Sequence, residues 1–195
     1  MQRTLFFLLI ICLFAACEQV PNPRPKGYFK IDFPEHTYRV FDSTGYPYQF
    51  EYPQYARVIK DSVFFEDAPE NPYWINVDFP DYNARLHISY KQIGTKQQLE
   101  RLVEEAFKLT SKHTLKASSI EEEQVRLSPD VQGFVFHVGG NAATGKQFFL
   151  TDSVKHFLRG ALYFDVAPNA DSLLPVSDFL YRDIEHLMKT LRWKK

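Results

Sequence analysis

The segment from Gly140 to Lys146 has the glycine and lysine spacing of a phosphate-binding loop. A loop of that kind holds nucleotide phosphates when Ser or Thr follows the lysine to bind magnesium and a helix begins there to donate backbone N–H groups. In this chain Gln147 follows the lysine, and the next residues, 148–150 (FFL), are typical of a strand. We therefore interpret the segment as a glycine-containing hairpin loop and expect no nucleotide.

Asp152, Ser153 and His156 have the side chains of a hydrolytic triad, which consists of an orienting acid, a nucleophile and a base. The members of such a triad usually come from separate segments, and they need oxyanion donors that no motif in this sequence supplies. An Asp-Ser pair between two strands is typical of a turn. We assign no catalytic residue, and an envelope hydrolase that uses Ser153 and His156 is the least favoured of three hypotheses.

Metal binding is the next chemistry to consider, because the chain has six histidines. They are scattered along the sequence, and none stands in a His-Glu-x-x-His pattern. A zinc site assembled from distant strands stays open as an alternative, but we expect neither a metal nor another cofactor. The six residues are His36, His87, His113, His137, His156 and His186.

Cys17 is the residue with the clearest chemical assignment. Arg3, an apolar run over residues 5–14 and the small residues before Cys17 have the order of a signal peptide. The run is too short to span a membrane as a helix, which takes about 20 apolar residues. The position of the cysteine resembles a bacterial lipobox, with Phe14 where that pattern usually has Leu. We predict cleavage before Cys17 and its acylation, which would anchor the chain in membrane lipid. The alternative is an ordinary secretory signal with an incidental cysteine.

The remaining composition is that of one globular domain without disulfides. Cys12 lies in the predicted signal peptide, so no thiol is left for pairing once Cys17 is acylated. With 45% hydrophobic residues and a formal charge of −1, the chain has enough apolar residues for a core and no broad basic surface for nucleic acid. We divide it into a signal peptide (1–16), a lipidated cysteine with a Pro-rich tether and irregular lead-in (17–36), and a single domain (37–195).

Hydrophobic periodicity predicts the elements of that domain. Strands are expected near residues 37–42, 47–52, 56–61, 73–79, 85–90 and 122–127, and three more within 133–166. In the last of these, Leu158 and Leu162 face a core, whereas Arg159 and Tyr163 lie on an amphipathic face. One helix is predicted after a capping box that begins at Thr95, and a second has its apolar stripe over 176–191.

Short links between neighbouring strands favour antiparallel pairing. We therefore predict an α+β fold, a mainly antiparallel sheet covered by two amphipathic helices. The order of the elements resembles the Mog1/PsbP-like architecture.

Several stretches of the chain resemble one family. They are the lipobox at Cys17, the segments PKGYFKIDFPEHTY and GKQFFLTDSVKHFLRGALYF, and the closing TLRW. Together they resemble the gliding-motility lipoprotein GldD family of Bacteroidetes-type bacteria over essentially the full length. The resemblance implies a membrane-anchored envelope protein required for gliding and associated with type IX secretion, with no enzymatic activity or catalytic residues to transfer. Residues 18–20 (EQV) lack the acidic pair typical of surface-export signals in such bacteria, which favours the periplasmic side.

Our leading hypothesis from the sequence is a non-enzymatic structural or interaction component, whose partners are membrane lipid and other envelope proteins of gliding and secretion. Tethering raises the effective concentration of the domain near a partner, so a modest contact surface suffices. The alternative is a small-ligand or lipid-binding periplasmic module, because helices on a sheet can leave an aromatic pocket. The expected contact surface combines the hairpin loop with two exposed residues of a later strand, and comprises Gly140, Asn141, Lys146, Arg159 and Tyr163.

Overall fold

The computed structural model describes residues 27, 30–60 and 70–194. The predicted signal peptide, Cys17 and most of the predicted tether lie outside the described residues. The chain divides into two units, Met1–Ile31 and Asp32–Lys195, and every helix and strand described below belongs to the second. Within the described residues, no helix is both long and apolar enough to cross a membrane.

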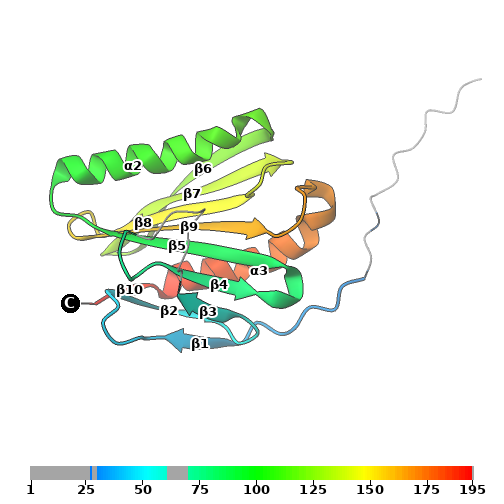
Figure 1. Cartoon of the computed structure of the whole chain (residues 1–195), viewed down its shortest axis with the longest axis horizontal. Coiled ribbons are helices and arrows are strands. Elements are labelled where there is room, and N and C mark those ends of the chain that lie inside the picture. Colours follow the sequence, from blue (N-terminus) through cyan, green and yellow to red (C-terminus); the bar gives the residue numbers. More distant parts are fainter. Residues whose placement is uncertain (1–26, 28–29, 61–69, 195) are drawn as a thin grey trace, which may run out of the picture. The chain divides into compact units, whose positions relative to one another are not determined.

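Seven antiparallel strands form the main sheet of the compact unit, in the order β3-β4-β5-β9-β8-β7-β6 (Figure 1). The predicted antiparallel pairing is confirmed, since every neighbouring pair in this sheet is antiparallel. The pairing of β9 with β5 joins the first and second halves of the chain. The strands are β3 (Arg57–Lys60), β4 (Ile75–Phe79), β5 (Ala84–Gln92), β6 (Ala117–Ser128), β7 (Val131–Gly140), β8 (Lys146–Thr151) and β9 (His156–Phe164).

A smaller sheet has the order β1-β2-β10. Its first two strands, β1 (Tyr38–Phe41) and β2 (Tyr48–Pro53), correspond to those predicted near residues 37–42 and 47–52, and they pair antiparallel. The third, β10 (Arg192–Trp193), was not predicted, because two residues are too few to show an alternating pattern. It places the end of the chain beside its first hairpin, where the N–H of Lys194 donates to the carbonyl of Pro47 at 2.9 Å.

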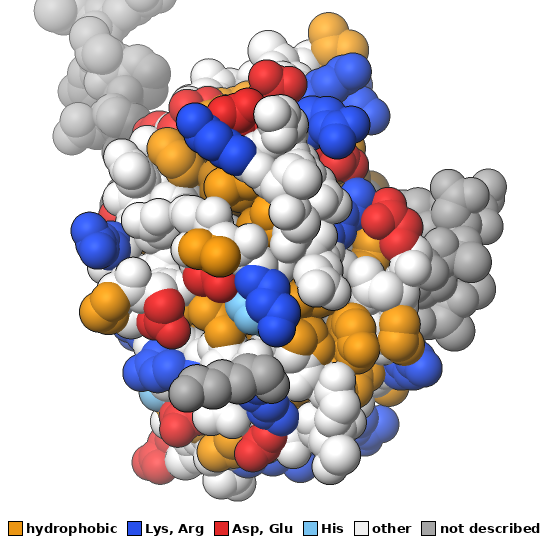
Figure 2. Space-filling model, turned by 90° about the vertical axis from the view of Figure 1, so that its left-hand side faces the viewer, with side chains coloured by type: hydrophobic (Ala, Val, Ile, Leu, Met, Phe, Trp, Pro, Cys, Tyr) orange, Lys and Arg blue, Asp and Glu red, His pale blue; other side chains and the backbone are white. Residues whose placement is uncertain are grey.

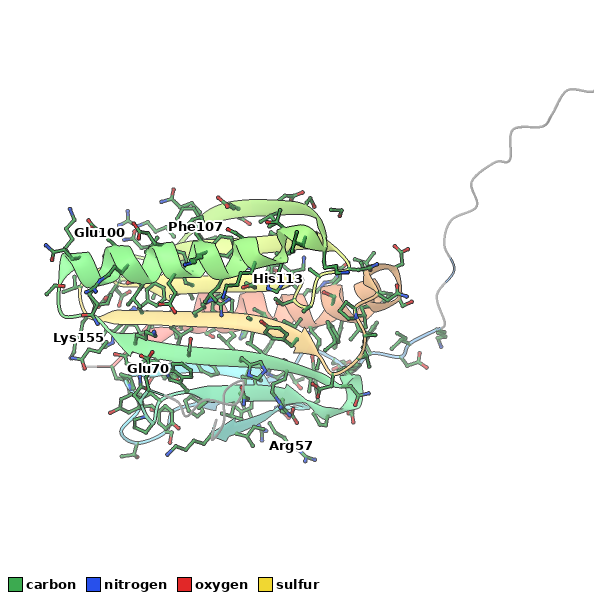
Figure 3. All side chains as sticks on the ribbon, turned by 45° about the horizontal axis from the view of Figure 1, so that its top comes forward. Arg57, Glu70, Glu100, Phe107, His113 and Lys155 are labelled. Atoms are coloured by element: carbon green, nitrogen blue, oxygen red, sulfur yellow. The ribbon has the colours of Figure 1, made fainter. Side chains whose placement is uncertain are left out.

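The helix α2 (Lys96–Ser111) covers one face of the main sheet (Figure 3). Its predicted N-cap is confirmed, since Thr95 Oγ1 accepts the N–H of Gln98 at 3.2 Å and Gln98 Oε1 accepts the N–H of Gly94 at 2.9 Å. A 3-10 turn, η2 (Lys112–Leu115), follows α2, and another, η1 (Pro80–Tyr82), joins β4 to β5. The buried residues of the α2 layer are mostly aromatic or aliphatic: Ile93, Leu102, Ala106, Phe136, Phe149 and Phe157.

The helix α3 (Ala170–Thr190) covers the opposite face, where Leu180, Ile184 and Leu187 pack in one core with Leu158 and Leu162 of β9. Neighbouring residues of β9 belong to different clusters, which shows that the two helices lie on opposite sides of the sheet. The predicted α+β fold, a mainly antiparallel sheet covered by two amphipathic helices, is therefore confirmed. The face of β9 that was expected to stay amphipathic is covered by α2.

Two elements extend beyond their predicted bounds. The helix α3 begins before the stripe predicted from Val176, because Asn169 caps it. Pro175 lies in its second turn, where it lacks the backbone N–H that a helix residue normally donates. The strand β6 starts at Ala117 instead of near residue 122. Its first five residues, 117–121 (ASSIE), contain only one large apolar side chain, so they give no alternating apolar signal from which a strand could be predicted.

Candidate functional site

The segment between β7 and β8 is a hairpin loop, as its sequence indicates. Strand β8 begins at Lys146, so no helix follows the lysine as a phosphate-binding loop would require. The N–H of Val138 donates to the carbonyl of Gly145 at 2.9 Å and closes the loop. Gly140 has a φ of +81° and its Cα lies against β6, where an added Cβ would approach the backbone nitrogen of Ser118 to 2.7 Å. Glycine is therefore needed at this position.

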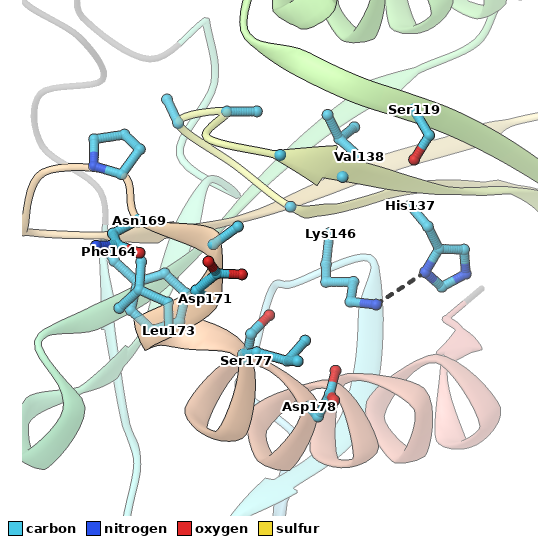
Figure 4. A pocket seen from close by; sticks show the side chains of 18 of the residues that line it. Ser119, His137, Val138, Lys146, Phe164, Asn169, Asp171, Leu173, Ser177 and Asp178 are labelled. Atoms are coloured by element: carbon cyan, nitrogen blue, oxygen red, sulfur yellow. Dashed lines mark hydrogen bonds between the residues drawn. The ribbon is translucent and has the colours of Figure 1, made fainter. Parts of the chain in front are cut away.

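A cavity of about 340 Å³, here called the hairpin groove, lies between this hairpin, β6 and the first turns of α3 (Figure 4). Two of its apolar residues, Val166 and Leu174, are about half exposed, at 48% and 49%. Three of the five residues predicted as a contact surface belong to this region, since Gly140 and Lys146 line the groove and Asn141 joins its two walls. The apolar lining consists of Val138, Ala142, Ala143, Phe164, Val166, Pro168, Ala170, Leu173 and Leu174.

Asn141 fixes the hairpin to α3. Its Oδ1 accepts the N–H of Ala170, the first residue of the helix, at 2.9 Å. Asn169 Oδ1 accepts the N–H of Ser172 at 3.2 Å. Two of the backbone N–H groups at the start of the helix thus donate to neutral side chains. Asp171 adds a negative charge in the first turn. With these contacts and an acid in its first turn, the start of α3 does not favour a phosphate group.

Lys146 extends into the groove from β8, and its ammonium group contacts the rings of Tyr181 and His137. Its Nζ lies 4.5 Å from the centre of the Tyr181 ring. It also lies 3.1 Å from Nδ1 of His137, a contact drawn as a dashed line in Figure 4. Burial and the charge of Lys146 lower the pKa of His137, which keeps the imidazole neutral at pH 7 and lets Nδ1 accept from the ammonium group. The other ring nitrogen of His137 lies 3.8 Å from a carboxylate oxygen of Glu123. This arrangement holds a cation at one end of the groove.

Acidic side chains outnumber basic ones in the groove. Glu121, Asp171 and Asp178 line it, against one lysine. Because His137 is neutral at pH 7, the lining has an excess of negative charge. The groove therefore favours an occupant with apolar groups and positive charge over an anion.

Arg159 and Tyr163 do not lie with the hairpin groove. They project from β9 toward the α2 side, since Arg159 pairs across the sheet with Phe149 of the α2 layer, whereas Lys146 pairs with Leu162 of the α3 core. The expectation that both are exposed is wrong, because both are half-buried. Arg159 Nη2 donates to the side-chain oxygen of the buried Gln147, and burial lowers the pKa of Arg159 and raises that of Tyr163. The predicted contact surface is divided between two faces of the sheet.

The three residues considered as a triad make other contacts. Asp152 Oδ1 accepts the N–H groups of residues 154, 155 and 156 at 2.8 to 2.9 Å, which is the turn expected from the sequence. Ser153 Oγ accepts from Gln132 at 2.8 Å. His156 is buried, its Nδ1 lies 2.7 Å from the hydroxyl of Tyr90, and its ring stacks on Trp193. These contacts do not pair a nucleophile with a base.

Two further histidines contact carboxylates. His186 Nε2 lies 2.6 Å from Glu51, and His36 Nδ1 lies 2.6 Å from Asp183. Among the described residues, no group of three or more His, Cys, Asp or Glu side chains could hold a metal ion.

Asp183 is the centre of a polar cluster that sequence reasoning missed. It is 1% exposed, and its carboxylate accepts from Tyr38 at 2.9 Å, from His36 and from the hydroxyl of Tyr55. The pKa values of both tyrosines are raised by burial and by this acceptor. A local signal was present, because Asp183 interrupts the apolar stripe of α3 next to Ile184.

This cluster, here called the Asp183 cluster, attaches the segment before β1 to α3. His36 stacks on Phe179 at 4.6 Å between ring centres, and Phe33 stacks on the same ring at 4.3 Å. The residues just before the first strand are thus bound by hydrogen bonds and aromatic packing to the helix that covers the core.

The fold and its contacts first define the class of protein: an α+β domain with its main sheet between two helices and a groove beside a hairpin. The family model for the gliding motility lipoprotein GldD matches residues 18–193, and the chain belongs to that family. As a lipoprotein of this family it is anchored to a membrane of the cell envelope. The solution structure of cyanobacterial PsbP (CyanoP) from Synechocystis sp. PCC 6803 is similar over 83% of this chain and 95% of that chain, with 12% identity and a TM-score of 0.43. No curated protein matches the chain significantly.

Proposed function

We propose that the chain is a non-enzymatic interaction component of the gliding apparatus and of the associated type IX secretion machinery, held on the periplasmic side of a membrane by acylated Cys17. The observation that supports this role best is the hairpin groove, a formed apolar depression with a defined charge pattern. A family of gliding motility lipoproteins provides the cellular context.

The hairpin groove has the properties of a protein contact. Its walls are fixed in advance, because Asn141 joins the hairpin to α3 and Lys146 is held on Tyr181. A surface that is already ordered loses little conformational entropy on binding. Its half-exposed Val166 and Leu174 supply apolar area that a partner can cover, with charged residues at the rim.

The anchor lowers the affinity that such a contact needs. A domain held at a membrane meets a partner in the same membrane at a high effective concentration. Replacing Cys17 with Ser should move the protein from the membrane fraction to the soluble periplasmic fraction and abolish gliding. If Cys17→Ser protein sediments with membranes and cells still spread, the lipid anchor is not required and this part of the proposal fails.

A site-directed experiment tests the groove. A photo-crosslinking amino acid at Leu174 in the full chain should capture gliding or secretion envelope proteins in living cells. The same amino acid at Leu115, which is 94% exposed in η2, serves as the control. The double variant Val166→Ser with Leu174→Ser should lose partner recovery and slow colony spreading, whereas Leu115→Ser with Val154→Ser should not. Equal recovery with both double variants would show that the groove is not the contact surface.

A small-ligand role is the second candidate, and the cavity volume favours it. About 340 Å³ lies within the range of roughly 300–1,000 Å³ found for small-molecule sites. Native mass spectrometry of the protein purified from its own envelope would test this role. A ligand that is present in the wild-type chain and absent from the Val166→Ser, Leu174→Ser variant supports it, and unliganded mass in both opposes it.

A further inference from the structure

The strand β6 ends the main sheet, and among the described strands it has a neighbour, β7, on one side only. It is long, with 12 residues, against 4 for β3 at the opposite end of the sheet. In a terminal strand, half of the backbone N–H and C=O groups point away from the sheet, where another strand can pair with them. Most of its side chains are exposed, so the described part of the chain leaves β6 largely uncovered.

The middle of β6 is regular. Its pairing with β7 has irregularities at Ala117/Ser119 and at Arg126/Ser128, and it continues without a shift between them. A stretch from Ser119 to Arg126 is therefore extended and straight enough to guide an added strand.

Three successive glutamates lie in this regular stretch. Glu121 and Glu123 pair with His137 and Val135 and lie on the α3 side, whereas Glu122 pairs with Phe136 and lies on the α2 side. Negative charge is thus present on both faces of one free edge. A second copy of this chain paired antiparallel through the same stretch would bring glutamates together, which disfavours a homodimer. A strand with Lys or Arg at these positions would instead place opposite charges side by side.

The edge is continuous with the hairpin groove. Ser119, labelled in Figure 4, and Glu121 of β6 both line the groove. A strand added beside β6 would therefore direct the side chains on its α3 side toward the groove. A partner strand can therefore combine basic residues beside the glutamates with a bulky apolar residue near Val166 and Leu174.

We propose that β6 is a docking edge for an extended, basic segment of a partner protein, which pairs antiparallel or parallel with β6 and extends the main sheet. The proposal rests on the interaction role proposed above and names its partner chemistry. Main-chain hydrogen bonds supply affinity in this mode, and side-chain positions on alternate faces supply specificity. The glutamates then have two effects, since they prevent self-association and select a positively charged partner.

Peptide binding to the purified full chain tests whether a partner segment adds to β6 as a strand. The probe is a ten-residue peptide with Lys at three consecutive central positions and Val or Thr elsewhere. We expect it to bind and to slow amide hydrogen exchange at alternate residues between Ser119 and Arg126. The same peptide with alternate backbone amides methylated keeps its charge but cannot pair, and it should bind about tenfold more weakly. Equal binding of the methylated peptide, or no protection in β6, would overturn strand addition.

A charge exchange tests the selectivity. The variant Glu121→Lys, Glu122→Lys, Glu123→Lys should lose at least about tenfold in affinity for the Lys peptide and gain affinity for a matching Glu peptide. Circular dichroism and the midpoint of thermal unfolding check that the variant is folded, and Glu122→Lys alone provides a milder form. Unchanged preference for the Lys peptide in folded protein contradicts the proposal.

The two proposals fail in different ways. If the charge-exchanged variant supports normal partner recovery and gliding while the Val166→Ser, Leu174→Ser variant does not, the docking edge is wrong and the groove role stands. If neither variant affects recovery, the interaction role assigned to this side of the molecule is wrong as well.

Discussion

The Asp183 cluster and the hairpin groove both contact α3, but the charged group in each differs in its burial and in its hydrogen-bonding partners. Asp183 is 1% exposed and has three hydrogen-bonding partners on its carboxylate. Lys146 is half-buried beside a cavity, and its contacts are with the rings of Tyr181 and His137. A fully satisfied buried charge stabilises one arrangement of the chain, whereas a charge held by weaker contacts at an opening can be used in binding.

The largest difference between the two regions should appear when each loses an acid. Asp183→Ala removes a buried carboxylate and leaves the partly buried hydroxyls of Tyr38 and Tyr55 without their acceptor. We expect a loss of about 3–5 kcal/mol in the free energy of unfolding. Asp178→Ala removes an exposed acid of the same helix from the groove, and should change that free energy by less than about 0.5 kcal/mol. Urea unfolding followed by circular dichroism measures both. Similar values for the two variants would remove the distinction.

Removing a single contact from each region should lower the free energy of unfolding in the same order, by smaller amounts. Tyr55→Phe removes one hydrogen bond to a buried carboxylate, which we expect to cost about 1.5–3 kcal/mol. Lys146→Met keeps most of the side-chain volume and removes a cation from the Tyr181 ring, at a cost of about 0.5–1 kcal/mol. A larger loss of unfolding free energy for the lysine variant in the same assay would mean that the contacts of Lys146 mainly stabilise the fold.

Removing the N-cap of α3 tests whether the end of this helix at the groove and its end at Asp183 unfold together. Asn169→Ala removes the acceptor for the N–H of Ser172 and should cost about 1 kcal/mol. Because the cap acts locally, hydrogen exchange should increase in the first turn beside the groove and stay unchanged near Asp183. Thr95→Ala, at the start of α2, is the matched control and should accelerate exchange only there. Faster exchange along the whole of α3 after the Asn169 change would show that the groove and the Asp183 cluster form one cooperative unit.

Local patterns predicted most of the fold correctly. The turn at Asp152, the cap at Thr95 and the hairpin loop that ends at Lys146 depend on residues close in sequence, and each has the expected form. The α+β class followed from the order of strands and helices, because short links impose antiparallel neighbours. Strand β6 was too short in the prediction, since an exposed edge strand does not need alternating apolar residues.

The sites were harder to predict, because they depend on which faces meet. Alternation placed Arg159 and Tyr163 correctly on one face, but only the packing of α2 shows that this face is covered. The carboxylate of Asp183 gathers donors more than 120 residues away in the sequence, as the separation of 128 from Tyr55 illustrates. Such a contact has no local pattern beyond an acid in an apolar stripe.

The smallest expected effect concerns protonation of His137 in the groove. Its pKa is lowered from 6.5 in the folded chain by burial and by the charge of Lys146, so the unfolded chain takes up a proton at a higher pH than the folded chain. The free energy of unfolding should therefore be unaffected by His137 well above pH 6.5 and should fall as the pH drops below that value. His113 and His156 also have lowered pKa values from burial and act in the same direction.

Lys146→Met isolates the part of this effect that belongs to the groove. Removing the lysine charge should bring the pKa of His137 closer to its ordinary value, so stability should fall less steeply on acidification than in the wild-type chain. The measurement is a series of urea unfolding curves between pH 7.5 and pH 5, at constant ionic strength, for both proteins. His113 and His156 are unchanged in the variant, so their contribution cancels in the difference between the two series. A difference that does not vary with pH would mean that Lys146 does not affect the protonation of His137, and that the charge in the groove is better screened by solvent than its contacts indicate.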